Sequence, residues 1–276
     1  MKLNLVPART GMTWVREGLR IFWRMPLAFA GLFLMFAVAV TVLSVIPLAG
    51  PLLAAALVPA VTAGFMAATR QAEQGRFPLP ATLLAAFGQS RRQTRAILLL
   101  GAVHVVALLV IGLILAALVD DSQLARLTEL FQLIEQNGGK ITPELTIGNP
   151  VWHEAMRVLR RLMALGGLLY LPVSAMLWHA PALVLWHDLP VGKSLFFSAV
   201  AVLRNAPAYL VYGLGWLAVA SIAWAGLLIV ASMTGNPPQM AVSGTPPLGA
   251  LVMSMFYTSL WLTFRDSFTP DSPPAK

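Results

Sequence analysis

The chain has 276 residues, of which 58% are hydrophobic and 11% charged, with a formal net charge of +8 and no cysteine. Soluble domains carry about 25% charged residues, so this composition indicates a membrane protein. The lack of cysteine excludes disulfides, thiolate metal sites and cysteine nucleophiles. The basic residues flank apolar stretches and form no basic–aromatic run, so we expect anionic lipid head groups, and no nucleic acid, as the counter-charge.

The first apolar stretch, 26–46, follows a basic N-terminal segment. Its 21 residues carry no charge, and about 20 apolar residues span the hydrocarbon core of a bilayer. The basic residues before it are Lys2, Arg9, Arg16, Arg20 and Arg24. Because a cluster of Lys and Arg beside a span holds that end in the cytoplasm, we predict an integral membrane protein with its N-terminus inside.

Five further apolar stretches follow the first one. They cover residues 52–69, 96–119, 162–186, 208–232 and 248–264, and a polar external segment, 120–161, separates the third from the fourth. Helices satisfy every backbone polar group within one segment, as a bilayer requires. The sequence therefore predicts an all-α fold in a single membrane domain, 1–276. It is a bundle of six transmembrane helices in three hairpins, with short interfacial helices on the cytoplasmic side.

The distribution of basic residues predicts that both ends of the chain are cytoplasmic. With six spans, 14 of the 19 Lys and Arg residues fall in cytoplasmic segments and five in external ones. This asymmetry follows the positive-inside rule. The external basic residues are Arg126, Lys140, Arg157, Arg160 and Arg161. The last three precede the fourth span on the disfavoured side, where positive charges in a longer loop count for less.

Three segments of helical period, each with basic residues near its end, precede the outward spans. They cover residues 11–26, 79–95 and 191–207. This pattern predicts a unit of interfacial helix, outward span and inward span, used three times. In the first segment the arginines repeat every four residues and form one stripe, and we expect the rings of Trp14 and Phe22 at head-group depth. The predicted head-group contacts are Arg16, Arg20, Arg24, Arg91, Arg92 and Arg95.

The external segment predicts an amphipathic helix over residues 121–136. Four apolar residues recur there at helical spacing, and Asn137 with two glycines ends the pattern. These apolar residues are Leu124, Leu127, Phe131 and Ile134. A loop around Pro143 and Pro150 follows, and the next helix begins near Trp152. This helix and loop form the main polar part of the chain.

Two histidines lie within predicted spans, where ionisable residues are rare and often functional. His104 in the third span and His179 in the fourth lie at a similar depth, roughly 10–12 Å from the cytoplasmic boundary at 1.5 Å per residue. They form a candidate intramembrane polar pair, which could ligate haem or relay protons. A lone neutral imidazole in a helix bundle is more often hydrogen-bonded to a neighbouring Ser, Thr or carbonyl, and we expect no cofactor and no metal.

Small residues and prolines mark the second and fourth spans. Residues 56, 60, 64 and 68 of span two are Ala or Gly at four-residue spacing, which is typical of close helix packing. Prolines in spans two and four would bend or break these helices, as in many transporters. They are Pro51, Pro59, Pro172 and Pro181. No acidic coupling residue accompanies them.

Several short segments also carry a likeness to known proteins. They are Trp14–Gly18, Phe22–Pro26, Pro47–Gly50, Ala180–Leu183 and Phe264–Phe268, together with Pro59 and Gly64. With them the chain resembles an uncharacterised group of proteobacterial six-span inner-membrane proteins, known as domains of unknown function. More distantly, it is similar to the membrane domains beside glycerophosphodiester phosphodiesterases, whose catalytic domain has no counterpart here. The resemblance implies an inner-membrane location and no reaction.

No motif in the sequence indicates an enzyme. His153 and Glu154 are adjacent and would diverge on a helix, and Gly192-Lys193-Ser194 lacks the upstream glycine of a phosphate-binding loop. We expect a non-enzymatic component that interacts with lipids, with partner membrane proteins or with a second copy of itself. The alternative is a small-solute or lipid transporter that uses the proline-kinked spans two and four. A water-filled cavity at the midplane would favour transport.

Overall fold

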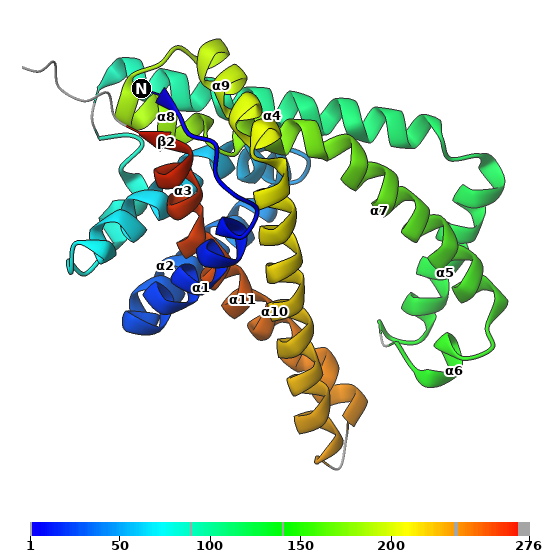
Figure 1. The fold of residues 1–276 in the computed structure, drawn as a ribbon. Helices are drawn as coiled ribbons and strands as arrows, with labels where there is room; N and C mark the ends of the chain where they lie inside the picture. The colour runs from blue at the N-terminus through cyan, green and yellow to red at the C-terminus, as the bar shows by residue number, and fades with distance from the viewer. Residues whose placement is uncertain (1, 89, 140, 235–236, 270–276) are drawn as a thin grey trace, which may run out of the picture. The chain divides into compact units, whose positions relative to one another are not determined.

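The computed structural model describes residues 2–88, 90–139, 141–234 and 237–269, which leaves Lys140 and the tail from residue 270 outside the described residues (Figure 1). Within these ranges, six helices are long and apolar enough to cross a membrane, and the predicted all-α membrane fold is confirmed. The chain forms two compact units. One comprises Met1–Val103 and Ala175–Lys276, and the other His104–Ser174.

Four helices form the core of the first unit. Helix α1 (Thr10–Arg24) packs against both α10 (Ala206–Ser232) and α11 (Pro237–Ser267), and α3 (Ala49–Glu73) packs against α11 as well (Figure 1). Large rings fill the space between these helices. The fully buried ones include Trp14, Phe22, Phe29, Phe65 and Tyr212. The centre of this unit is therefore a packed aromatic core.

The other helices of the first unit surround this core. Helix α2 (Pro26–Ser44) packs on α3 and α11, while α8 (Ala180–His187) packs on α3 and on α9 (Val191–Arg204). A 3-10 helix, η1 (Pro80–Leu84), lies against α3 and precedes α4 (Arg91–Ala117). Most of the apolar windows of α2, α4 and α10 stay exposed, as expected for helices that face lipid.

The second unit contains the predicted external helix, α5, which runs Asp121–Gln136 as the periodicity predicted. The Asp120 side chain caps it by accepting the backbone N–H of Gln123 at 2.8 Å. A four-residue helix, α6 (Pro143–Thr146), follows, and then α7 (Pro150–Leu177). Arg126 of α5 bonds Glu154 of α7 at 2.8 Å, so an ion pair joins these two helices.

The fourth span is interrupted. Helix α7 ends at Leu177 and α8 begins at Ala180, with Trp178 and His179 between them. Pro181 lies in the first turn of α8, and it has no N–H for the carbonyl of Leu177, so a continuous helix would lose that bond. The predicted break is confirmed here, whereas α3 continues as helix through Pro59 and α7 through Pro172.

The sixth span is longer than the predicted stretch 248–264. Helix α11 runs from Pro237 to Ser267 and continues through Pro246 and Pro247, which lie before the predicted stretch. Membrane helices tolerate proline where hydroxyl groups and neighbouring helices compensate the lost backbone bonds. Thr245 donates its hydroxyl to the carbonyl of Ala241 at 2.6 Å, in the turn just before the prolines.

The two ends of the described chain lie side by side. Strand β1 (Lys2–Leu3) pairs antiparallel with β2 (Phe268–Thr269), so that Leu3 faces Phe268. The backbone N–H of Asn4 donates to the carbonyl of Ser267 at 2.9 Å and extends this pairing. Both ends must therefore lie on one side of the membrane, which an even number of spans allows.

The segments before the outward spans differ from one another. The first and third contain full helices, α1 and α9, whereas the second contains only the five residues of η1 before α4 begins at Arg91. The basic residues of the second segment therefore lie on the span helix itself. The order of elements follows the predicted unit and the length of the preceding helix differs, while the interfacial position of that helix and the direction of each span stay predictions.

Small residues on α3 do pack against neighbours, as their spacing predicted. A Cβ on Gly64 would lie 2.7 Å from the backbone of Leu83 in η1, and one on Gly101 of α4 would lie 2.3 Å from the Ala56 carbonyl oxygen. Ala60 and Ala68 are buried as well. The absence of larger side chains lets the backbones approach closely here.

Candidate functional site

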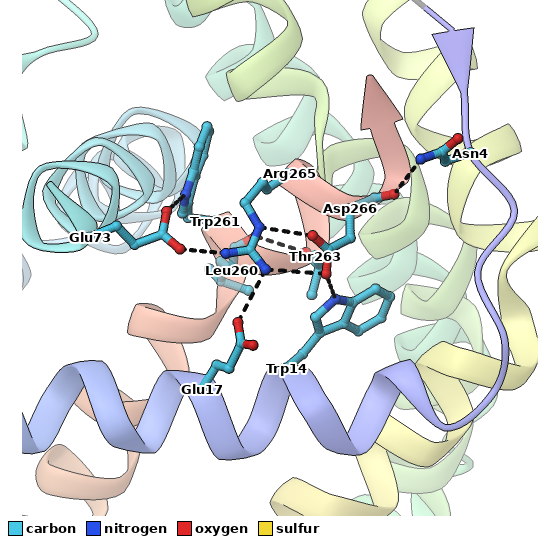
Figure 2. Close-up of polar contacts among 9 residues, drawn as sticks. All are labelled: Asn4, Trp14, Glu17, Glu73, Leu260, Trp261, Thr263, Arg265 and Asp266. Carbon is cyan, nitrogen blue, oxygen red and sulfur yellow. Dashed lines mark hydrogen bonds and ion pairs between the residues drawn. The ribbon is translucent and has the colours of Figure 1, made fainter. Parts of the chain in front are cut away.

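One arginine joins three carboxylates where α1, α3 and α11 meet (Figure 2). Arg265 Nε lies 2.8 Å from Asp266 Oδ1, and its Nη2 lies 3.1 Å from Glu17 Oε2. Its Nη1 donates to Glu73 Oε1. We call Arg265, Glu17, Glu73 and Asp266 the arginine brace. The fork of five N–H donors on a guanidinium suits it to several acceptors at once.

Two indoles complete the arginine brace. Trp14 donates its Nε1–H to Asp266 Oδ2 at 2.9 Å, and Trp261 donates to Glu73 Oε2 (Figure 2). The guanidinium carbon of Arg70 lies 5.4 Å from the indole centroid of Trp261 and 5.6 Å from that of Trp186. A cation over an aromatic face is attracted by the ring electrons.

The local sequence brings these groups together through helix geometry. Trp14, Gly18 and Phe22 recur at four-residue spacing and form the buried face of α1, which Glu17 adjoins. Trp261 and Arg265 are likewise one turn apart on α11, so both reach the end of α3 where Glu73 lies. The arginine brace therefore forms only when the middle of α1 lies against the C-terminal ends of α3 and α11.

Chemically, the arginine brace holds helices rather than a reacting group. Each of its three carboxylates accepts a bond from Arg265, and two of them also accept from an indole. The side chains of Arg265 and Glu17 are 36% and 32% exposed, so each bond is worth less than in a dry interior. The arrangement suits a brace that fixes α1 against α3 and α11.

The predicted arginines of α1 lie on its outer face. Arg16, Arg20 and Arg24 are all exposed, opposite the buried face, and no carboxylate of the described chain forms an ion pair with them. Trp14 and Phe22 are 0% and 1% exposed, so their rings lie inside the protein, and their depth in the membrane stays a prediction. These rings fill the core because α1 packs on α10 and α11 along its whole apolar face.

The second predicted group of arginines lies at the start of α4. Arg91, Arg92 and Arg95 are exposed. Arg92 pairs with Asp188 at 2.9 Å, which leaves Arg91 and Arg95 without a carboxylate partner among the described residues. Arg91 and Arg95 line a hollow of about 410 Å³, together with Phe87, Ser90, Thr94 and Leu98.

Each of the predicted histidines has a tyrosine partner. His104 Nε2 lies 3.0 Å from the Tyr170 hydroxyl, and His179 Nε2 contacts the Tyr209 hydroxyl. The two histidines belong to different compact units, and their role as a pair stays a prediction. His179 is fully buried, and its Nδ1 has no partner among the described residues.

Sequence reasoning did not find the arginine brace. Glu17 and Glu73 are single acids next to basic segments, and Arg265 counted as one more cytoplasmic charge. The one signal was the segment Phe264–Phe268, which the resemblance singled out without assigning a role. Contacts between residues 17, 73 and 265 depend on how the helices pack, which periodicity within each helix does not reveal.

Over 276 residues, the whole of its length, the chain is 34% identical to a probable inner membrane protein of Burkholderia thailandensis, of which it covers 97%. No family model matches the chain, and no solved structure matches it. The inner-membrane location of the relative agrees with the six apolar helices of the structure. The protein is therefore a multi-pass protein of the inner membrane.

Proposed function

We propose that the chain, which belongs to the same family as this probable inner membrane protein, is a non-enzymatic membrane component that binds anionic lipid head groups. The exposed arginines of α1 make the main contact. Partner membrane proteins or a second copy would pack on the exposed apolar faces of α2 and α10. The distant likeness to membrane domains beside glycerophosphodiester phosphodiesterases stays a prediction.

The observation that carries this proposal is the division of α1 into two faces. One face is buried against α10 and α11 and is fixed by Trp14 and Glu17 through the arginine brace. The opposite face presents Arg16, Arg20 and Arg24, one turn apart. A fixed row of unpaired positive charge beside a membrane span is attracted to an anionic leaflet, by about 1 kcal/mol for each residue near the surface.

The proposal includes the orientation of the chain. The ends of the chain lie on one side of the membrane because β1 pairs with β2. Since 14 of 19 basic residues fall on that side of a six-span chain, we place both ends in the cytoplasm. The anionic cytoplasmic leaflet then faces the arginines of α1.

The test replaces Arg16, Arg20 and Arg24 together with Gln and measures insertion into vesicles that contain or lack phosphatidylglycerol. Insertion should weaken in the anionic vesicles only, because neutral lipid offers no counter-charge. A triple Lys variant should largely restore insertion, since a diffuse field needs charge and not the fork of a guanidinium. If the triple Lys variant inserts as poorly as the triple Gln variant, these arginines bind a specific acidic protein partner and not lipid.

A second candidate function, transport of a small solute or lipid, is favoured by the break between α7 and α8. The backbone N–H of His179 there donates to Ser198 Oγ at 2.8 Å, and Nδ1 of the same ring is unpartnered within the described chain. Interrupted helices can mark a transport site. With no native cysteine, a Ser198→Cys variant tests this directly. We expect protection from aqueous thiol reagents, and rapid labelling would favour transport.

A further inference from the structure

The hollow at the start of α4 has the chemistry of a phospholipid site. We propose that it binds the phosphate group of one anionic glycerophospholipid, through Arg91 and Arg95. This deepens the proposed function and rests on it in one respect, that this end of α4 lies at an anionic leaflet. Here the contact is one lipid in one site, unlike the diffuse attraction proposed for α1.

The first argument is the arrangement of charge. Arg91 and Arg95 are one turn apart on α4, and both line the hollow of about 410 Å³. Neither pairs with a carboxylate among the described residues, whereas Arg92, which points elsewhere on the helix, pairs with Asp188 at 2.9 Å. Two guanidinium groups on one face can hold a phosphate with paired N–H donors. Ser90 and Thr94 also line the hollow, but their hydroxyl hydrogens are donated to Gln93 Oε1 and to the carbonyl of Phe87, so the arginines supply the donors for a phosphate.

The second argument is the apolar part of the lining. Phe87 and Leu98 also face the hollow, and Leu98 is 56% exposed on the side of α4 that continues toward the bilayer. Residues 91, 94, 95 and 98 share one face of the helix, because they are spaced by three or four. A ligand in this hollow therefore meets both positive charge and apolar surface. A phospholipid has that polarity, and free phosphate does not.

The third argument is that hydrogen bonds hold part of this lining in place. The hydroxyl of Thr94 donates to the carbonyl of Phe87 at 3.3 Å, which fixes the preceding loop to the helix. Ser90 Oγ accepts the backbone N–H of Gln93 at 3.2 Å and caps the first turn. The side chain of Gln93 reaches the carbonyl of Leu185 at 3.3 Å. A lining fixed in advance loses less entropy when a ligand binds.

The experiment measures binding of dioctanoyl phosphatidylglycerol to the full chain in neutral detergent, by native mass spectrometry and by titration calorimetry. The test variant carries Arg91→Gln and Arg95→Gln. The matched control is Arg92→Gln on the same helix, which removes a guanidinium that does not line the hollow. We expect one lipid bound per chain, an affinity at least about tenfold lower in the test variant, and a change below about twofold in the control.

Further arms separate the possible outcomes. The triple Gln variant of α1 should keep this stoichiometric binding, so a failure of the proposed function for α1 and a failure of this site are told apart. Dioctanoyl phosphatidylcholine should bind much more weakly, and inorganic phosphate at the same concentration should not displace the lipid. Equal losses of lipid affinity in Arg92→Gln and in the test variant would overturn the site, as would displacement of the lipid by inorganic phosphate. Unfolding midpoints of all variants check that each protein folds.

Discussion

Arg265 shows how a single side chain can join three helices. It bonds carboxylates from α1, α3 and its own helix α11, and the indoles of Trp14 and Trp261 reach the same carboxylates. Removing it leaves three acids close together at a partly buried position. Breaking such a network costs more than its individual bonds, because the remaining charges repel and stay unpaired.

We therefore expect Arg265→Gln to lower the free energy of unfolding by about 1–3 kcal/mol, given that the pairs are partly exposed. Thermal or denaturant unfolding in detergent measures this. The control is Arg204→Gln, an exposed arginine at the end of α9, which should be near neutral. If Arg265→Gln and Arg204→Gln unfold alike, the arginine brace contributes nothing to stability.

At the scale of elements, close approach of helix backbones decides how α1 packs. A Cβ on Gly18 would lie 2.6 Å from the Cβ of Ser259 in α11. The carbonyl of Gly18 also accepts the Thr258 hydroxyl at 3.0 Å. Any side chain at this position must push α1 away from α11 and stretch the bonds of the arginine brace.

Gly18→Ala should therefore destabilise the protein by roughly 1–3 kcal/mol through overpacking. Gly31→Ala in α2 is the matched control, since nothing lies within 4 Å of its Cβ position, and alanine favours helix. The unfolding midpoint should fall for Gly18→Ala, and it should rise or stay unchanged for Gly31→Ala. Equal stability would show that α1 and α11 can separate at no cost.

The cap of α5 predicts a dependence on pH in the polar segment. Bonds from the Ser122 hydroxyl and the Gln123 N–H hold the pKa of Asp120 below its ordinary value of 3.8. The folded form thus gains stability above that value and loses it as the pH falls through the lowered pKa. The protection of amides in the first turn of α5, measured as the exchange rate relative to the intrinsic rate at each pH, should therefore fall in acid, and an Asp120→Asn variant, which cannot titrate, should lack this dependence.

The helices themselves could be predicted from apolar length and charge, and the packing between them could not. Apolar stretches of about 20 residues predicted the six spans, and the helical spacing of apolar residues in 121–136 predicted α5. The extension of α11 through Pro246 and Pro247 was missed because two prolines in sequence normally end a helix. The arginine brace was missed because Glu17, Glu73 and Arg265 lie far apart in the chain.

At the scale of the whole molecule, the proposed lipid contacts depend on which side of the membrane carries the arginines of α1 and α4. The pairing of β1 with β2 brings the two ends of the described chain together, and we propose from the excess of basic residues that this side is cytoplasmic. The lipid contacts proposed for α1 and for the hollow at α4 both require this orientation, because the cytoplasmic leaflet is anionic. An inverted chain would leave both groups of arginines facing the wrong leaflet.

Single-cysteine labelling measures this most directly, because the chain has no cysteine of its own. Cysteine would replace the exposed Gln74, Gly138 or Gly192, one at a time, and intact cells would receive a thiol reagent that does not cross the inner membrane. We expect labelling of Gly138→Cys in intact cells, and of Gln74→Cys and Gly192→Cys only after the membrane is opened. Labelling of Gln74→Cys or Gly192→Cys in intact cells would contradict it.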